Sequence, residues 1–148
     1  MPYLADTNIL LRSLEPGTPM CDQAAEAINR IRRAADSVWI TPQVVAEFWC
    51  SATRPQSANG LGLTPSEADA EVTRIESLFL LAPDSEPVYR EWRRLVAGHG
   101  VSGIQVHDAH LAASMIVHGI GRVLTFNVRD FARFPEVTAV HLADVPPA

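Results

Sequence analysis

Three of the carboxylate residues are unusual in their positions, because they lie at the ends of expected elements or within apolar runs. Asp6 follows the apolar run Tyr3–Ala5, Glu47 lies within VVAEFW, and Asp108 lies within VHDAHLAA. If these carboxylates converged to about 5 Å, each pair would repel by about 3 kcal/mol at an effective dielectric of 20. Such a cluster persists only when it takes up protons or binds a cation. Carboxylate oxygens without nearby thiolates favour Mg²⁺ or Mn²⁺.

A fourth group of polar side chains follows an apolar run closer to the C-terminus. In LTFNVRDF, the residues Thr125, Asn127 and Asp130 come at or just past the end of a strand that we expect over 122–126. A turn stabilised by Asx hydrogen bonds explains the same residues without any chemistry. The two interpretations differ in whether these side chains lie beside the other carboxylates.

Each of the three carboxylates also has an ordinary structural explanation. Asp6 and Asp108 stand where helix N-caps are expected, and a capping carboxylate accepts hydrogen bonds from the first helical N–H groups. Glu47 lies at helical spacing from Val44 and Cys50, at the rim of the core, where it pairs with an arginine or extends toward water. Taken together, the three positions favour a shared site over three unrelated structural roles.

Apolar strands alternate with longer amphipathic helices along the chain, which predicts a parallel sheet covered by helices on both faces. In open α/β sheets, ligands bind at the carboxyl ends of the strands. Asp6 and the residues after the strand at 122–126 therefore meet at one edge if their strands are neighbours. The expected strands are 3–5, 38–40, 80–82, 122–126 and 137–142, and the expected helices start at Thr7 and cover 21–35, 42–54, 64–78, 88–98 and 107–118.

Composition limits the classes of protein that this chain can be. Its 148 residues, of which 47% are hydrophobic, fit a single domain over residues 1–148 with a full core. A net charge of −5 argues against a general nucleic-acid coat protein but not against a nuclease with an acidic site. The chain contains no lysine, which excludes a P-loop lysine and a Schiff base.

Apolar runs and cysteines indicate where the protein works. No apolar run approaches about 20 residues, so no membrane span is expected, and the N-terminus lacks the pattern of a signal peptide. The two cysteines do not form a disulfide framework, so we expect a reducing cytoplasm with Cys50 as a buried thiol.

The segments LADTNILL, VVAEFW, VHDAHLAA and LTFNVRDF, in this order and spacing, resemble the four motifs of PIN-domain nucleases. Within that family the chain is most similar to the compact VapC-type toxins of prokaryotic toxin–antitoxin pairs. The resemblance implies a three-layer α/β/α fold with a central, mainly parallel sheet of about five strands. It also implies a Mg²⁺- or Mn²⁺-dependent endoribonuclease.

The resemblance assigns roles to residues that match the motifs. Asp6, Glu47 and Asp108 match the acidic triad, and Asn127 with Asp130 matches the fourth position, where Asn127 contributes no charge. Thr7 and Asn8 match family residues that orient the first aspartate, and Thr125 is also expected to have an orienting role.

The expected mechanism is hydrolysis of an RNA phosphodiester bond by a metal-activated water. Asp6 and Asp108 hold one metal ion, and Glu47 acts through a water or as a base. Because the 2′-hydroxyl takes no part, the products carry 5′-phosphate and 3′-hydroxyl ends. Arginine suits bidentate phosphate contacts, and the candidates are Arg12, Arg54 and Arg129, with Arg133 also close in sequence to the site.

The resemblance also implies partners for the chain. VapC-type toxins pair with a small antitoxin that blocks the acidic site, and they usually form homodimers. Apolar residues at 9–14 and 28–31 supply either such surfaces or the core.

Several alternatives remain open at this point. A PIN-type nuclease in RNA processing that is not a toxin shares every motif, and a PIN-like scaffold that only binds RNA or a partner would lack the triad. An HD-type phosphohydrolase would use His107 and Asp108, but that class is all-helical. A metal-free ribonuclease would use His107 and His110, and a haloacid-dehalogenase-like phosphatase would need an aspartate at position 8 and a lysine.

Overall fold

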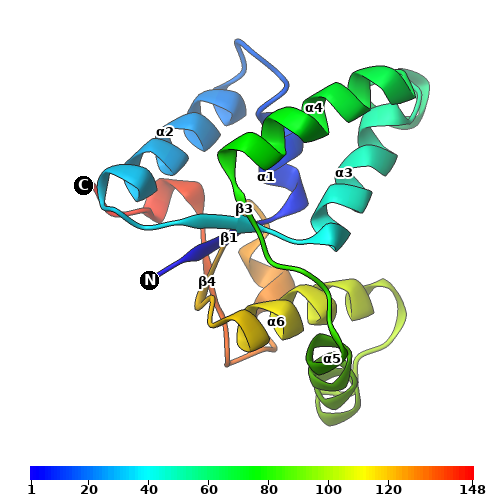
Figure 1. Ribbon diagram of the computed structural model, residues 1–148, viewed down its shortest axis with the longest axis vertical. Helices are drawn as coiled ribbons and strands as arrows, with labels where there is room; N and C mark the ends of the chain where they lie inside the picture. Colours follow the sequence, from blue (N-terminus) through cyan, green and yellow to red (C-terminus); the bar gives the residue numbers. More distant parts are fainter.

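Five short parallel strands form the centre of the fold, and helices cover both faces of the sheet (Figure 1). The computed structural model describes residues 1–148. The strands are β1 (Tyr3–Ala5), β2 (Val38–Ile40), β3 (Leu80–Leu81), β4 (Arg122–Leu124) and β5 (Thr138–Val140). They lie in the order β3-β2-β1-β4-β5, and every neighbouring pair is parallel. The predicted three-layer α/β/α fold is therefore confirmed.

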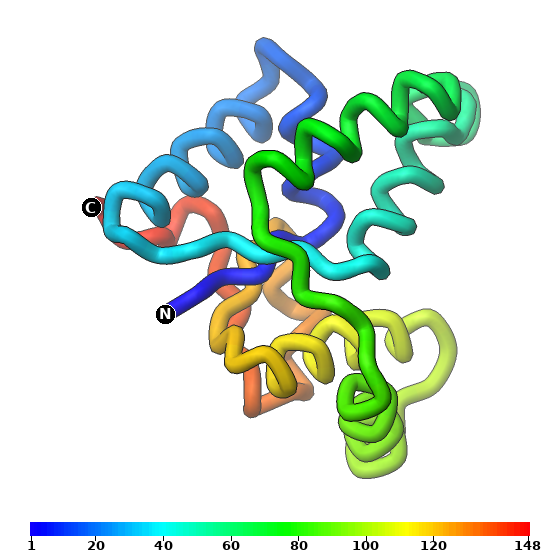
Figure 2. The backbone as a smooth tube through the Cα atoms, in the orientation of Figure 1, coloured from blue at the N-terminus to red at the C-terminus, as the bar shows by residue number.

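Helices α1 to α4 lie on one side of the sheet, and α5 and α6 lie together on the other (Figure 1). The chain passes from the first group to the second after β3, as the tube in Figure 2 shows. None of the helices is both long and apolar enough to cross a membrane. The helices are α1 (Thr7–Arg12), α2 (Pro19–Arg33), α3 (Pro42–Thr53), α4 (Pro65–Leu78), α5 (Glu86–Gly98) and α6 (Val106–His118), with short 3-10 turns η1 (Gln56–Ala58), η2 (Gly103–Gln105), η3 (Val128–Phe131) and η4 (Leu142–Asp144).

A repeated local signal starts four of the helices. A threonine or serine side chain accepts a hydrogen bond from a backbone N–H in the first turn, and a proline occupies one of the first two helical positions. In α4 the predicted capping box is confirmed, because Thr64 and Glu67 each bond the other's backbone N–H. The caps are Thr18, Thr41, Thr64 and Ser85.

The order of the strands fixes where a ligand can bind. The chain moves outward from β1 to β2 and β3, and then returns to the other side of β1 with β4. The gap between the carboxyl ends of β1 and β4 is thus a topological switch point, where open α/β sheets bind their ligands. Ala5 pairs with Leu124, so Asp6 and Thr125 are the next residues on neighbouring strands.

Differences from the predicted elements are small and have local causes. The strand β4 ends at Leu124 rather than at 126, where the chain turns into η3, and β5 spans only Thr138–Val140. The prediction that Cys50 is buried was wrong: it lies on the solvent side of α3, whereas Phe48 and Ala52 face the core.

The loop after α3 is fixed by a close backbone approach. A Cβ atom at Gly60 would lie well under 3.0 Å from the carbonyl oxygen of Arg54, so a side chain cannot enter without moving the backbone. We expect Gly60→Ala to lower the free energy of unfolding by about 1–3 kcal/mol through overpacking. Urea unfolding followed by circular dichroism measures this change. Gly98→Ala is the control, because its Cβ would meet nothing within 4 Å.

Candidate active site

Asp6 links the end of β1 to the start of α1 and has both of its oxygens engaged. Oδ1 accepts a hydrogen bond from the Thr7 N–H at 2.8 Å, so Asp6 is the N-cap of α1. The expectation that Asp6 caps a helix is therefore confirmed. Oδ2 accepts a hydrogen bond from the Thr125 hydroxyl at 2.8 Å. The cap therefore sits at the switch point, beside the first residue after β4.

Thr125 is fully buried and holds three partners together. While its hydroxyl donates to Asp6, it accepts from the Asn127 N–H at 2.9 Å and from the Asn8 side-chain amide at 3.4 Å. Asn8 therefore acts on Asp6 through Thr125 rather than by direct contact. This arrangement fits the orienting role expected for Thr125.

Glu47 reaches the same edge from α3, and both of its oxygens accept hydrogen bonds. Oε2 accepts from the Thr7 hydroxyl at 2.6 Å, and Oε1 accepts from the Gln43 side-chain amide at 2.8 Å. The Thr7 hydroxyl thus orients the second carboxylate, while only its backbone contacts the first. No arginine pairs with Glu47, which removes one of its ordinary structural explanations.

Gln43 is a residue of the site that the sequence analysis did not single out. Its amide nitrogen donates both to Glu47 and, at 2.9 Å, to the carbonyl oxygen of His107. The one side chain therefore ties α3 to the start of α6, next to Asp108. A spacing of four residues from Glu47 on a helix puts both side chains on one face, and that signal could have found it.

Asp108 lies in the first turn of α6 but does not cap it. The N-cap is Gln105, and the Asp108 carboxylate makes no hydrogen bond within the chain. Its pKa is raised to about 7, mainly by burial and also by the charges of Asp130, Asp6 and Glu47, whereas Arg133 lowers it. The four carboxylates therefore act on one another across four separate elements.

Asp6 shows the same electrostatic crowding. Burial raises the pKa of its carboxyl, and the charges of Glu47 and Asp130 raise it as well. The hydrogen bonds from Thr125 and Thr7 lower the pKa and so offset part of this rise. Negative charge at this edge is thus only partly balanced by the chain itself.

The turn after β4 presents two further groups. Asn127 and Asp130 are exposed, and neither side chain makes a hydrogen bond within the chain. A backbone hydrogen bond from the Asp130 N–H to the Asn127 carbonyl closes the turn at 3.1 Å, so the alternative of a turn stabilised by Asx side-chain hydrogen bonds was wrong. Both side chains are therefore free to contact a ligand.

The arginines predicted to contact RNA differ in their surroundings. Arg12 pairs with Glu15 at 3.1 Å, the guanidinium of Arg54 lies 3.7 Å from the Cys50 sulfur, and Arg129 forms no ion pair. Among these arginines, only Arg133 affects the pKa of Asp6 or Asp108, because its charge lowers that of Asp108. It is therefore the arginine best placed to meet an anionic ligand there.

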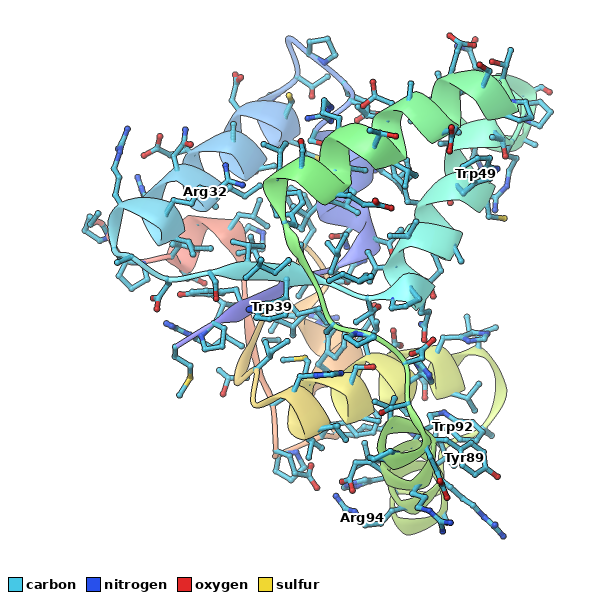
Figure 3. All side chains as sticks on the ribbon, viewed as in Figure 1. Arg32, Trp39, Trp49, Tyr89, Trp92 and Arg94 are labelled. Carbon is cyan, nitrogen blue, oxygen red and sulfur yellow. The ribbon has the colours of Figure 1, made fainter.

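Trp92 supports the site from the other helix layer. Its indole N–H donates to the carbonyl oxygen of Val106 at 2.8 Å, which fastens α5 to the first residue of α6. Figure 3 shows Trp92 beside Tyr89 on α5, with Trp49 far away on α3. This contact holds the helix start that carries Asp108.

The donor set at this edge suits a hard divalent cation, because it consists of carboxylate and amide oxygens without a thiolate. No group of three or more His, Cys, Asp or Glu side chains is arranged to hold a metal ion as the side chains stand. The two observations are compatible, since charges interact over several ångströms whereas metal ligands must approach much more closely. A metal ion at this cluster is therefore a prediction that requires the side chains to move closer together.

Several solved structures share the fold of this chain at low sequence identity. No curated protein sequence matches the chain. Among solved structures, VapBC2 from Rickettsia felis, bound to a DNA fragment from its promoter, gives a TM-score of 0.72 at 16% identity over 95% of this chain and 98% of that one. DNA-bound VapBC from Salmonella typhimurium gives 0.68 at 20% identity over 96% and 98%. VapC20 from Mycobacterium tuberculosis, described as a toxin that cleaves the sarcin–ricin loop, gives 0.58 at 15% identity over 82% and 86%.

At such identities these structures establish a shared fold. The PIN domain family itself matches residues 3–137, which is most of the sequence. The chain belongs to the PIN domain family.

Proposed function

We propose that the protein is a Mg²⁺- or Mn²⁺-dependent endoribonuclease and the toxin of a VapC-type toxin–antitoxin pair. The observation that carries this proposal is the crowding of Asp6, Glu47, Asp108 and Asp130 at the switch point of the sheet. A cluster of like charges destabilises a fold unless a ligand offsets it. The four carboxylates come from four separate parts of the chain, which supports a functional rather than a structural role for the cluster.

The side chains have separate tasks in the proposed reaction. Asp6 and Asp108 would hold one metal ion, which when bound supplies an activated water and offsets charge on the phosphoryl oxygens. Thr125 orients Asp6 through its hydroxyl. Glu47 is held by Thr7 and Gln43 and takes a proton, directly or through a water.

The side chains of Asn127 and Asp130, which make no hydrogen bond within the chain, would contact the substrate or its bound water. The Asn127 carboxamide can donate to a phosphate oxygen, and Asp130 adds negative charge that draws a second cation or orients a water. Arg133 stands close enough to act on Asp108 and can approach a bound phosphate. Arg12, Arg54 and Arg129 would contact flanking nucleotides.

The assignment as a toxin draws on the structural neighbours. Several of them are toxin–antitoxin complexes, and one is described as an RNA-cleaving toxin. By analogy we propose a small antitoxin partner, a homodimer and action in the cytoplasm. Ile9, Leu10 and Ile31 are buried, so only Leu11, Leu14 and Ile28 remain from the two apolar segments to contact a partner.

The rival enzyme classes fit the structure less well. An HD-type phosphohydrolase is all-helical, whereas this chain has a five-stranded sheet. A histidine-based ribonuclease needs two imidazoles together. Here His107 meets Gln43 only through its backbone, and His110 lies 3.8 Å from Asp84.

Growth and cleavage assays test the proposal together. Expression of the chain without an antitoxin should slow bacterial growth, and Asp6→Asn should relieve this effect. Asp69→Asn on the exposed face of α4 is the control and should stay toxic. Purified wild-type chain that cleaves RNA with Mg²⁺ but has no effect on growth would favour a PIN-type nuclease in RNA processing. Equal toxicity of the Asp6→Asn variant would separate toxicity from this site.

Gln43 gives a subtler prediction. Gln43→Ala removes the hydrogen bonds to Glu47 and to the His107 carbonyl, so Glu47 loses its position relative to Asp108. Because Glu47 loses its position, we expect kcat for RNA cleavage to fall about tenfold, and because each net hydrogen bond is worth about 1 kcal/mol, we expect Tm to fall by about 2–5 °C. Single-turnover cleavage and thermal unfolding measure the two effects. Gln23→Ala, an exposed glutamine on α2, should change neither.

A further inference from the structure

A small polar cavity of about 140 Å³ lies between α1, the end of α3 and the loop that follows it. We propose that it binds one nucleobase of the RNA strand, next to the phosphate that is cut. This inference rests on the proposed ribonuclease activity and adds a site for substrate selection. The volume suits a single heteroaromatic ring and lies below the 300–1,000 Å³, roughly, of pockets that take whole small molecules.

The cavity is joined to the carboxylate cluster by one side chain. Asn8 lines the cavity, and its amide also donates to Thr125, whose hydroxyl holds Asp6. Arg12 lies four residues farther along α1, about 6 Å away along the axis. A strand whose phosphate sits at the cluster can therefore place an adjacent base in the cavity.

The charges in the cavity favour a neutral ring over a phosphate. The Arg12 guanidinium and the Glu15 carboxylate lie 3.1 Å apart and neutralise one another. A phosphate entering here would meet the Glu15 carboxylate, which repels it. Two leucines, Leu11 and Leu61, supply apolar walls for the faces of a ring.

Unused polar groups supply the means to read a base edge. The Ser51 hydroxyl and the Asn59 carboxamide line the cavity, and neither side chain makes a hydrogen bond within the chain. A carboxamide can donate and accept at the same time, as the edge of a base requires. Single-stranded RNA is recognised in this way, through unstacked bases that contact protein side chains.

The loop that carries Asn59 is held in one conformation. Asn59 has a left-handed backbone with φ of 61° and ψ of 27°. The Leu61 N–H bonds the Ser51 carbonyl at 3.3 Å, and the Gly62 N–H bonds the Arg54 carbonyl at 2.9 Å. Because the backbone is fixed before any ligand arrives, little ordering is needed on binding.

The test is the base preference of cleavage. A random RNA pool is digested with wild-type chain and Mg²⁺, and the ends are sequenced. We expect Asn59→Gly to reduce the preference at one position beside the cut on the order of tenfold while cleavage itself continues. Glycine is chosen because it accepts the positive φ of this position without strain. Ser51→Ala should relax the same position, and Ser57→Ala, in the same loop but outside the cavity, should relax none.

A binding experiment tests whether the cavity binds a nucleobase, and it does not depend on cleavage. RNA tetranucleotides of each base are titrated into isotope-labelled wild-type chain in EDTA, and side-chain amide signals are followed by NMR. The Asn59 signals should move with at least one base and not with the abasic analogue. An unchanged preference in Asn59→Gly together with silent Asn59 signals would overturn the proposal. So would a loss of antitoxin binding in Asn59→Gly with base preference intact, since the cavity would then serve a protein. Absence of RNA cleavage by wild-type chain would instead count against the proposed function alone.

Discussion

Replacing Asp108 by asparagine should reduce RNA cleavage by about 10³-fold or more, and it should also make the protein more stable at pH 8. Cleavage falls because the variant loses a charged ligand for the proposed metal ion, and 10³-fold corresponds to about 4 kcal/mol. Stability rises because asparagine avoids the cost of ionising a partly buried carboxyl group beside Asp130, Asp6 and Glu47. A residue that weakens the fold while serving the reaction is typical of an active site.

The pH dependence follows from the raised pKa of Asp108. The folded chain holds this proton up to about pH 7, whereas the unfolded chain releases it near its ordinary value of 3.8. The folded state therefore binds more protons between these values, and its stability falls as pH rises through that window. With allowance for solvent screening at a half-exposed group, we expect a loss of about 1–2 kcal/mol in the wild-type chain.

Urea unfolding in EDTA at pH 5 and pH 8 measures this difference. The stability gain of Asp108→Asn should be small at pH 5 and reach its full size at pH 8. Asp69→Asn, which removes an exposed carboxylate far from the cluster, should show no such dependence. A gain of equal size at both pH values would mean that neither burial nor the carboxylates of Asp6, Glu47 and Asp130 raise the pKa of Asp108.

Local sequence signals predicted the fold because each one acts over a few residues. The capping box of Thr64 and Glu67, the stop at Gly119 and the alternation of strands and helices are all confirmed. The sequence did not show which strands are neighbours, and the site required β1 to lie beside β4. The structure shows that the two strands do pair.

Contacts between distant elements could not be predicted in the same way. Whether the Thr7 hydroxyl turns to Asp6 or to Glu47 depends on how α1 packs against α3, which no short segment encodes. The bond from Gln43 to the His107 carbonyl depends likewise on the packing of α3 beside the start of α6. The exposure of Cys50 shows a related limit, since a mostly apolar run does not tell which side of a helix faces solvent.

Removal of divalent metal should stop cleavage altogether in the wild-type chain. EDTA leaves the carboxylates of Asp6 and Asp108 without the cation that offsets their charge, and Mg²⁺ or Mn²⁺ should restore the activity. Saturating Mg²⁺ at pH 8 should also raise the Tm of the wild-type chain by about 2–5 °C, because a ligand that binds only the folded state stabilises it. The Asp108→Asn variant should show almost no shift, which separates binding at the cluster from general salt effects.

The ends of the cleaved RNA distinguish the proposed chemistry from a metal-free route. Attack by an external water leaves 5′-phosphate and 3′-hydroxyl ends, whereas attack by the 2′-hydroxyl leaves a 2′,3′-cyclic phosphate. A substrate with a 2′-deoxy residue at the cut should therefore still be cleaved with Mg²⁺. Cyclic phosphate ends formed in EDTA would show that histidines rather than carboxylates do the work. In that case the crowding of Asp6, Glu47 and Asp108 would need another explanation, since no ion pair within the chain offsets it.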